Sequence, residues 1–146
     1  MKSSKNYLQM RTKLFVFDTS VVLQAMLSQR SNAYLALKKA DEIGIIVVSD
    51  ATLLELEEKV RHPKFDKYQT LESRLFFFRA YRLFALNIEP MIQISACRDP
   101  NDDMFLSLAV SANADCIISR DVDLLVLHPF HDIPIVQIGD FFKLFF

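Results

Sequence analysis

Four short apolar runs, rich in β-branched and aromatic residues, constrain the fold of this chain more than any other feature. They occupy residues 14–17, 45–48, 116–119 and 135–138. Apolar runs without polar alternation are typical of strands buried on both faces. Helical patterns lie between them at 20–27, 33–43, 51–60, 70–86 and 102–113. This alternation predicts the α/β class, a three-layer α/β/α sandwich around a mainly parallel sheet.

Length and composition favour one globular domain in the cytoplasm. The chain has 146 residues, of which 51% are hydrophobic and 24% charged, enough to bury a core. Residues 1–12 are polar and basic, so we expect a flexible N-terminal arm before a single domain at 13–146. No apolar run is long enough to span a membrane, and no signal-peptide core is present. Cys97 and Cys116 are expected to be free thiols in a reducing cytosol.

Acidic residues follow two of the apolar runs. Asp18 comes directly after the first run, and Asp121 comes soon after the third. The carboxyl ends of parallel strands meet at one edge of a sheet, where active sites of such folds lie. An ordinary alternative is that Asp18 only caps the helix that follows it. The adjacent hydroxyls of Thr19 and Ser20 could hydrogen-bond to the carboxylate or to a metal-bound water.

Further acids are placed near the same edge. Glu55 lies in the first turns of the helix after the second run, although most helical glutamates are merely solvated. The stretch Asp99-Pro100-Asn101-Asp102-Asp103 is the densest acidic region, and one of its acids could begin a helix. Asp102 fits the spacing to the following apolar residues better than Asp103, but both stay open as ligands.

Clustered carboxylates indicate a divalent-metal site. They repel one another unless a cation offsets their charge. Hard oxygen ligands suit Mg²⁺ or Mn²⁺, which can activate water for phosphodiester hydrolysis. Other chemistries find no support, because Gly44 and Gly139 are the only glycines and cannot form a phosphate-binding loop. His62, His128 and His131 are expected at the surface, outside any catalytic triad.

The order of the motifs resembles the PIN-domain family from Leu14 onward. The motifs are Phe17-Asp18-Thr19-Ser20, Leu53-Leu54-Glu55-Leu56, Asp99-Pro100-Asn101-Asp102 and Ile118-Ser119-Arg120-Asp121-Val122-Asp123. The resemblance is strongest to the VapC-like subgroup, the toxin components of bacterial toxin–antitoxin pairs. It implies a sheet of about five strands and a metal-dependent endoribonuclease, a hydrolase of RNA that is often a homodimer restrained by an antitoxin.

The same resemblance assigns roles to individual residues. Its catalytic and Mg²⁺- or Mn²⁺-binding positions correspond to Asp18, Glu55, Asp102 and Asp121. It also matches Asp123 to a common auxiliary acid and Ser20 and Ser119 to supporting hydroxyls. From their positions in the sequence, Asp99 and Asp103 are further candidate auxiliary acids and Thr19 is a further supporting hydroxyl. Asn101 stands where an acid is common, so the resemblance does not decide between one metal ion and two.

Basic and aromatic segments are candidate binding surfaces. Lys59, Arg61, Lys64 and Lys67 could hold the RNA backbone, although cations are also common at a solvated helix end. Arg74, Arg79 and Arg82 form a weaker second patch. The long helix carries Phe76, Phe77 and Phe78, which favour core packing with an exposed stripe for a second copy or an antitoxin helix.

Two other functions are consistent with these residues. One is a catalytically weak PIN-fold interaction module that binds a partner helix through the phenylalanine-rich surface. The other is a phosphotransfer domain with Asp18 as nucleophile, which is disfavoured because Ser20 occupies the position where a second aspartate is expected.

Overall fold

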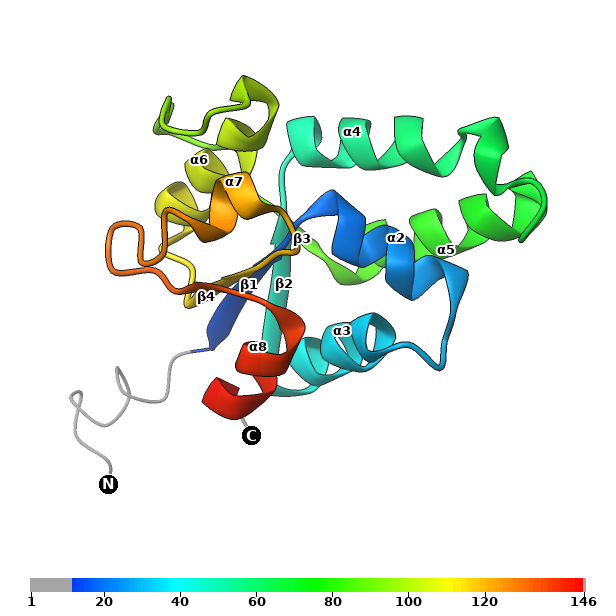
Figure 1. The fold of residues 1–146 in the computed structure, drawn as a ribbon, viewed down its shortest axis with the longest axis horizontal. Helices are drawn as coiled ribbons and strands as arrows, with labels where there is room; N and C mark the ends of the chain where they lie inside the picture. Colours follow the sequence, from blue (N-terminus) through cyan, green and yellow to red (C-terminus); the bar gives the residue numbers. More distant parts are fainter. Residues whose placement is uncertain (1–11, 146) are drawn as a thin grey trace.

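A five-stranded parallel sheet forms the centre of the molecule, whose computed structural model describes residues 12–145 (Figure 1). The strands are β1 (Lys13–Phe17), β2 (Gly44–Val48), β3 (Leu86–Asn87), β4 (Cys116–Ile118) and β5 (Ile135–Val136). Their spatial order is β3-β2-β1-β4-β5. Phe17 pairs with Ile118, so the carboxyl ends of β1 and β4 lie side by side at the centre of the sheet.

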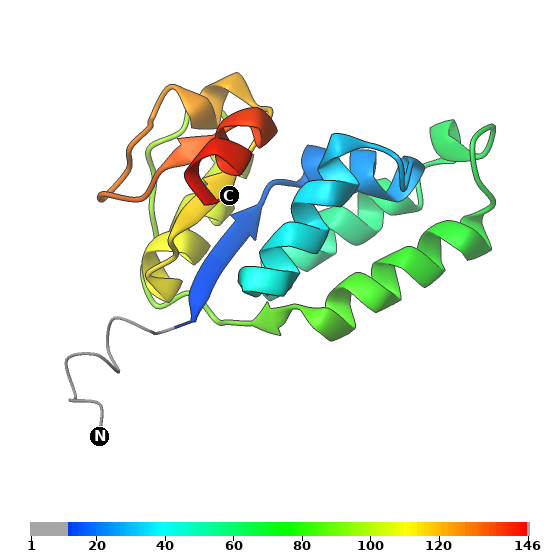
Figure 2. The ribbon, with the colours of Figure 1, turned by 90° about the horizontal axis from the view of Figure 1, so that it is seen from below.

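Helices cover both faces of the sheet. The α-helices are α2 (Thr19–Leu27), α3 (Asn32–Ile43), α4 (Asp50–Val60), α5 (Leu71–Phe84), α6 (Asp103–Ala112), α7 (Val122–Leu125) and α8 (Ile138–Phe145). Two 3₁₀ turns are added, η1 (Pro63–Phe65) and η2 (Pro100–Asp102). Helices α2 to α5 lie on one side of β1 and α6 on the other (Figure 2).

Alternate residues of the central strand supply the two cores. Phe15 and Phe17 pack with buried residues of α2 and α3, whereas Val16 packs with buried residues of α6. A strand that buries both faces must be apolar at every position, as the first run is. The three-layer α/β class predicted from the sequence is therefore confirmed.

Two segments differ from their predicted structure. The helix predicted at 70–86 ends at Phe84, and Leu86 begins the edge strand β3. The strand predicted at 135–138 ends at Val136, and Ile138 begins α8. Helix α8 forms there because it buries Phe141 against Phe15, with ring centroids 5.5 Å apart. The predicted N-terminal arm, 1–12, lies outside the described residues except for Thr12.

Gly44 allows β1 and β2 to approach closely. A Cβ atom at this position would lie 2.3 Å from the carbonyl oxygen of Lys13, a backbone atom that cannot move aside. Gly139, in contrast, has no atom of the described residues within 4 Å of such a Cβ. Only the first glycine is therefore required by packing.

Within residues 12–145, no helix combines the length and the apolar character needed to cross a membrane.

Candidate metal centre

The central strands β1 and β4 deliver the first two acids of the centre. Asp18 directly follows β1, and its backbone N–H donates to the carbonyl of Ile118 over 3.0 Å. Asp121 lies three residues beyond β4, at the same edge of the sheet. The two acids expected after buried strands are thus neighbours, as the strand order requires.

Asp18 is buried, and four donors surround its carboxylate. Oδ1 accepts from the Ser20 hydroxyl and the Val21 N–H, each over 3.0 Å. Oδ2 accepts from the Ser119 hydroxyl and from the Arg120 N–H, the latter over 3.1 Å. The bond from Val21 makes Asp18 the N-cap of α2. The alternative interpretation of Asp18 as a helix cap is therefore correct for Oδ1.

All lone-pair positions of Asp18 are therefore engaged, since a carboxylate offers about four. Ser20 is exposed, and its hydroxyl can rotate away. A cation would gain a lone pair of Asp18 by this rotation, without movement of the backbone.

Ser119 connects Asp18 to Asp121. Its buried hydroxyl donates to Asp18 Oδ2 and accepts from the Asp121 backbone N–H over 2.9 Å. Asp121 in turn caps α7 by accepting the Asp123 N–H over 2.9 Å. Both predicted supporting serines thus lie at the acids, Ser20 on Asp18 and Ser119 between the two aspartates.

Three carboxylates form the densest part of the centre. Oxygen atoms of Asp102, Asp121 and Asp123 all lie within 4.8 Å of one another. Asp102 Oδ2 is buried and has no hydrogen-bond partner among residues 12–145. Burial, together with its hydrogen bond to Asp121 and the negative charges of Asp121 and Asp99, raises the pKa of Asp102 to about 7. These acids repel one another in the absence of a cation.

The structure gives Asp102 and Asp103 different surroundings. Asp103 Oδ1 accepts from the backbone N–H groups of Ala96, over 3.0 Å, and Cys97, over 2.7 Å. These bonds lower the pKa of Asp103 and turn its carboxylate toward the preceding loop. Asp99 is exposed and caps η2 through the Asn101 N–H over 3.0 Å. Only Asp102 of this acidic stretch belongs to the dense group.

Glu55 joins the centre through a hydroxyl. Glu55 lies on α4 and is half-buried, and the Thr19 hydroxyl donates to its Oε2 over 2.5 Å. Because Thr19 directly follows Asp18, this bond connects α4 to the end of β1. The hydroxyl of Thr19 is therefore engaged with Glu55, whereas the hydroxyl of Ser20 is engaged with Asp18.

Arg98, which was not predicted from the sequence, also belongs to this region. Its guanidinium forms two hydrogen bonds to Asp123, Nε to Oδ1 over 3.0 Å and Nη2 to Oδ2 over 3.2 Å. The signal that could have identified it is an arginine directly before the acidic stretch that begins at Asp99.

The donor set fits a hard divalent cation. Three carboxylates converge, one buried oxygen lacks a partner within the described part of the chain, and the donors offered are oxygen atoms. Mg²⁺ and Mn²⁺ prefer such oxygen ligands over sulfur or imidazole. A cation among these acids would offset the repulsion that raises the pKa of Asp102.

The predicted RNA-binding cations lie beyond Glu55 along the chain. Lys59 is exposed one helical turn after Glu55, and Lys64 and Lys67 follow in and after η1. Arg61 is also exposed and pairs with Glu57 over 3.0 Å, a common contact within a helix. All four cations are accessible, as a surface for RNA requires.

The second predicted patch, on α5, is wrong for Arg74. This side chain is fully buried and donates to the carbonyls of Val60 and Gln69 and to Asp66 Oδ1. Burial is possible because each of these acceptors lies 2.5–2.9 Å away and satisfies the guanidinium. Arg74 is therefore a structural residue of the η1 region.

Comparison with known proteins identifies the fold and the family. The PIN-domain family model matches residues 15–123. The uncharacterized protein MJ1680 of Methanocaldococcus jannaschii is 30% identical over 114 residues, which cover 77% of this chain and 73% of that protein.

Two solved structures are similar in fold. VapBC2 from Rickettsia felis, bound to a DNA fragment from its promoter, is 14% identical with a TM-score of 0.59, covering 84% of this chain and 96% of that chain. VapBC-1 from nontypeable Haemophilus influenzae is 15% identical with a TM-score of 0.59, covering 86% and 98%. The match of the family model over most of the chain confirms the resemblance seen in the motifs, and the chain belongs to the PIN-domain family.

Proposed function

We propose that this protein is a Mg²⁺- or Mn²⁺-dependent endoribonuclease that hydrolyses phosphodiester bonds of RNA. The observation that carries the proposal is the group of Asp102, Asp121 and Asp123, with the unpartnered oxygen of Asp102. Asp18 and Glu55 complete the centre in this proposal. Membership of a nuclease family is consistent with these acids and with their place at the carboxyl edge of the sheet.

In this proposal the acids and hydroxyls of the centre have different roles. Asp102 and Asp121 would hold the cation, with Asp123 beside them, and the cation would supply an activated water and charge stabilisation at the leaving oxygen. Ser119 fixes Asp121 relative to Asp18 through one hydroxyl. Thr19 orients Glu55, leaving its second oxygen available to accept a proton from a water molecule.

We further propose that the protein acts in the cytoplasm as the toxin of a toxin–antitoxin pair, as a homodimer with an antitoxin partner. The support is similarity of fold to two VapBC proteins. An apolar groove of about 500 Å³ between α2, α3 and α5 offers a place for a partner helix. Phe76 and Phe84 line this groove and are 75% and 73% exposed.

The same groove favours a second candidate function, a catalytically weak module that binds a partner helix. The two functions differ in what they require of the acids. An interaction module needs no cation, whereas a nuclease must bind one. The phosphotransfer alternative is disfavoured further, because Asp18 is 3% exposed and both of its oxygens accept hydrogen bonds.

Cleavage of RNA tests the proposal directly. The purified protein should cleave single-stranded RNA with Mg²⁺ or Mn²⁺ and lose this activity in EDTA. Glu55→Gln should lower cleavage by at least about 100-fold, the usual effect of removing an acid–base group. Asp121→Asn removes a proposed cation ligand and should lower cleavage strongly as well. Matched controls are Asp140→Asn and Glu58→Gln, exposed positions on α8 and α4 that should retain full activity.

Normal cleavage by Asp121→Asn would refute the proposed site. No cleavage by the folded wild-type protein, together with no thermal stabilisation by Mg²⁺, would favour the interaction module.

A further inference from the structure

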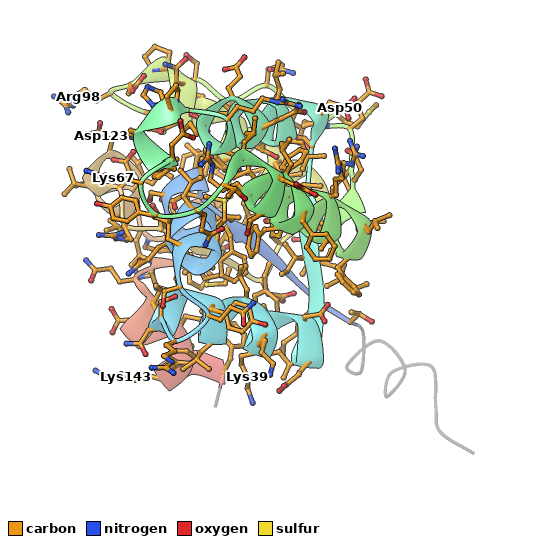
Figure 3. The ribbon with its side chains drawn as sticks, turned by 90° about the vertical axis from the view of Figure 1, so that its right-hand side faces the viewer. Lys39, Asp50, Lys67, Arg98, Asp123 and Lys143 are labelled. Carbon is orange, nitrogen blue, oxygen red and sulfur yellow. The ribbon has the colours of Figure 1, made fainter. Side chains whose placement is uncertain are left out.

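Arg98 places a positive charge at the rim of the acidic group. Its side chain is 84% exposed, whereas that of its partner Asp123 is 14% exposed. Asp123 offers a carboxylate oxygen within 4.8 Å of oxygens of Asp102 and Asp121. Arg98 and Asp123 lie at one end of the molecule, opposite Lys39 and Lys143 (Figure 3). The guanidinium is thus adjacent to the candidate metal centre and open to solvent.

Helix α6 fixes the loop that carries Arg98. Three α6 residues spaced four apart accept backbone N–H groups of this loop through their side chains. Ser111 accepts from Met91 and Ile92 over 3.1 Å each, Ser107 from Ile94 over 2.9 Å, and Asp103 from Ala96 and Cys97. Residues four apart lie on one helix face, so the loop runs along α6 and its last bonded residue directly precedes Arg98.

The pairing with Asp123 uses only part of the guanidinium. Nε and one N–H of Nη2 face Asp123, and a guanidinium carries five N–H donors. The two donors of Nη1 and the second donor of Nη2 take no part in this pairing. Two adjacent donors on a planar edge match the oxygens of a phosphate. Arg98 can therefore keep its bond to Asp123 while it binds an anion from solvent.

Binding of RNA beside the carboxylates requires a positively charged side chain next to them. A phosphate that enters a group of acids is repelled by every carboxylate that is not neutralised. The other candidate cations begin with Lys59, one helical turn beyond Glu55 on α4, and no contact of theirs with the acidic group is seen among residues 12–145. Arg98, in contrast, contacts the acidic group itself.

We propose that Arg98 is a substrate-binding residue that holds an RNA phosphate beside the carboxylates, and that Asp103 is its positioning residue. The inference rests on the proposed nuclease function. It gives Asp103 a role other than that of metal ligand, since Asp103 Oδ1 is occupied by the loop that ends at Arg98.

Salt dependence of RNA binding tests the contact. A fluorescein-labelled single-stranded RNA oligonucleotide is titrated with Asp121→Asn protein in Mg²⁺ at several salt concentrations, and anisotropy gives the affinity. The double variant that carries Arg98→Ala as well as Asp121→Asn should bind the RNA about tenfold more weakly than the Asp121→Asn protein. It should also make the slope of log affinity against log salt shallower by about 0.7, the value for one phosphate contact on a single strand.

Two further variants separate the charge from its shape and position. Arg98→Lys should restore the slope but not the whole affinity, because lysine cannot form the paired contact with Asp123. Lys143→Ala removes an exposed charge at the opposite end of the molecule and should leave the slope unchanged. Thermal unfolding establishes that each variant is folded.

The positioning role of Asp103 predicts a coupling. Asp103→Ala should weaken RNA binding in a protein that contains Arg98 and have no further effect in the Arg98→Ala protein. Asp103→Asn should bind RNA nearly normally, because an amide oxygen can accept both loop N–H groups in place of Oδ1. Equal effects of Asp103→Ala with and without Arg98 would overturn this role.

Several results would overturn the contact itself. An unchanged salt slope in Arg98→Ala would exclude a phosphate contact, as would absence of RNA binding by the parent protein. Faster cleavage or tighter RNA binding by Arg98→Ala would identify the guanidinium as a competitor of the cation. Failure of the nuclease function is a separate result, seen as no cleavage by wild-type protein, and the anisotropy series is independent of it.

Discussion

Replacement of Asp102 by asparagine should stabilise the metal-free protein, although it removes a candidate ligand. In the folded protein the pKa of Asp102 is raised from 3.8 to about 7 by burial and by the neighbouring acids, chiefly Asp121. A group whose folded pKa lies above its unfolded value binds more protons when folded. Its ionisation therefore destabilises the fold as pH rises from about 4 to about 7, and the whole penalty is present above pH 7.

The size of this penalty follows from the shift. About three pKa units correspond to about 4 kcal/mol at most. Asp102 is only partly buried, so solvent screens much of this energy and about 1–2 kcal/mol is a realistic penalty. For a chain of this length, that energy raises Tm by roughly 3–6 °C. Asparagine keeps the shape of the side chain and removes the charge.

Thermal unfolding in EDTA and in Mg²⁺ measures the effect. In EDTA at pH 7.5, Asp102→Asn should be more stable than wild type, and at pH 5 the difference should shrink because Asp102 is then mostly protonated. Mg²⁺ at a hundred times its Kd should stabilise wild type by about 2.7 kcal/mol and the variant by less. The advantage of Asp102→Asn over wild type should therefore shrink when Mg²⁺ is added.

The control is Asp140→Asn, an exposed position on α8 that should change stability by less than about 0.5 kcal/mol. If Asp102→Asn were no more stable than wild type in EDTA at pH 7.5, the reasoning from carboxylate repulsion would be refuted.

Two other substitutions test the framework around the centre. Ser119→Ala leaves the Asp121 N–H and one oxygen of Asp18 without their hydroxyl partner. Urea unfolding should therefore show a loss of about 1–3 kcal/mol in the free energy of unfolding, and RNA cleavage should fall as well. Unchanged stability would contradict the bridging role of Ser119. Gly44→Ala places a Cβ 2.3 Å from a carbonyl oxygen of β1 and should cost about 1–3 kcal/mol in the same assay, whereas Gly139→Ala should cost nothing. Equal stability of the two alanine variants would be evidence against a close approach of β1 and β2.

The sequence predicted the parts of the centre that follow from strand ends. Asp18 and Asp121 could be placed because β1 is apolar from Leu14 to Phe17, β4 is apolar throughout, and both strands stop abruptly. The edge strand β3 could not be placed in this way. Leu86 and Asn87 are exposed, so burial imposes no apolar pattern on them, and the preceding helical pattern continues through Leu86.

Side-chain direction was the other limit of sequence reasoning. Asp102 and Asp103 are adjacent and chemically identical. Their spacing to the following apolar residues favoured Asp102, but the path of the loop along α6 is what gives the two carboxylates different partners. Arg98 was missed for the same reason, because its contact with Asp123 spans 25 residues of sequence. Arg74 was assigned to a surface patch because charge alone does not reveal acceptors that can satisfy a buried guanidinium.

The buried guanidinium of Arg74 has a consequence for nucleic-acid recognition. It joins the end of α4, the residue after η1 and the segment that leads into α5, through Val60, Asp66 and Gln69. The exposed cations of this region, Lys64 and Lys67, are therefore carried on a backbone that is already ordered before a ligand arrives. A preorganised surface loses less conformational entropy on binding, so each of its charges contributes more fully to affinity.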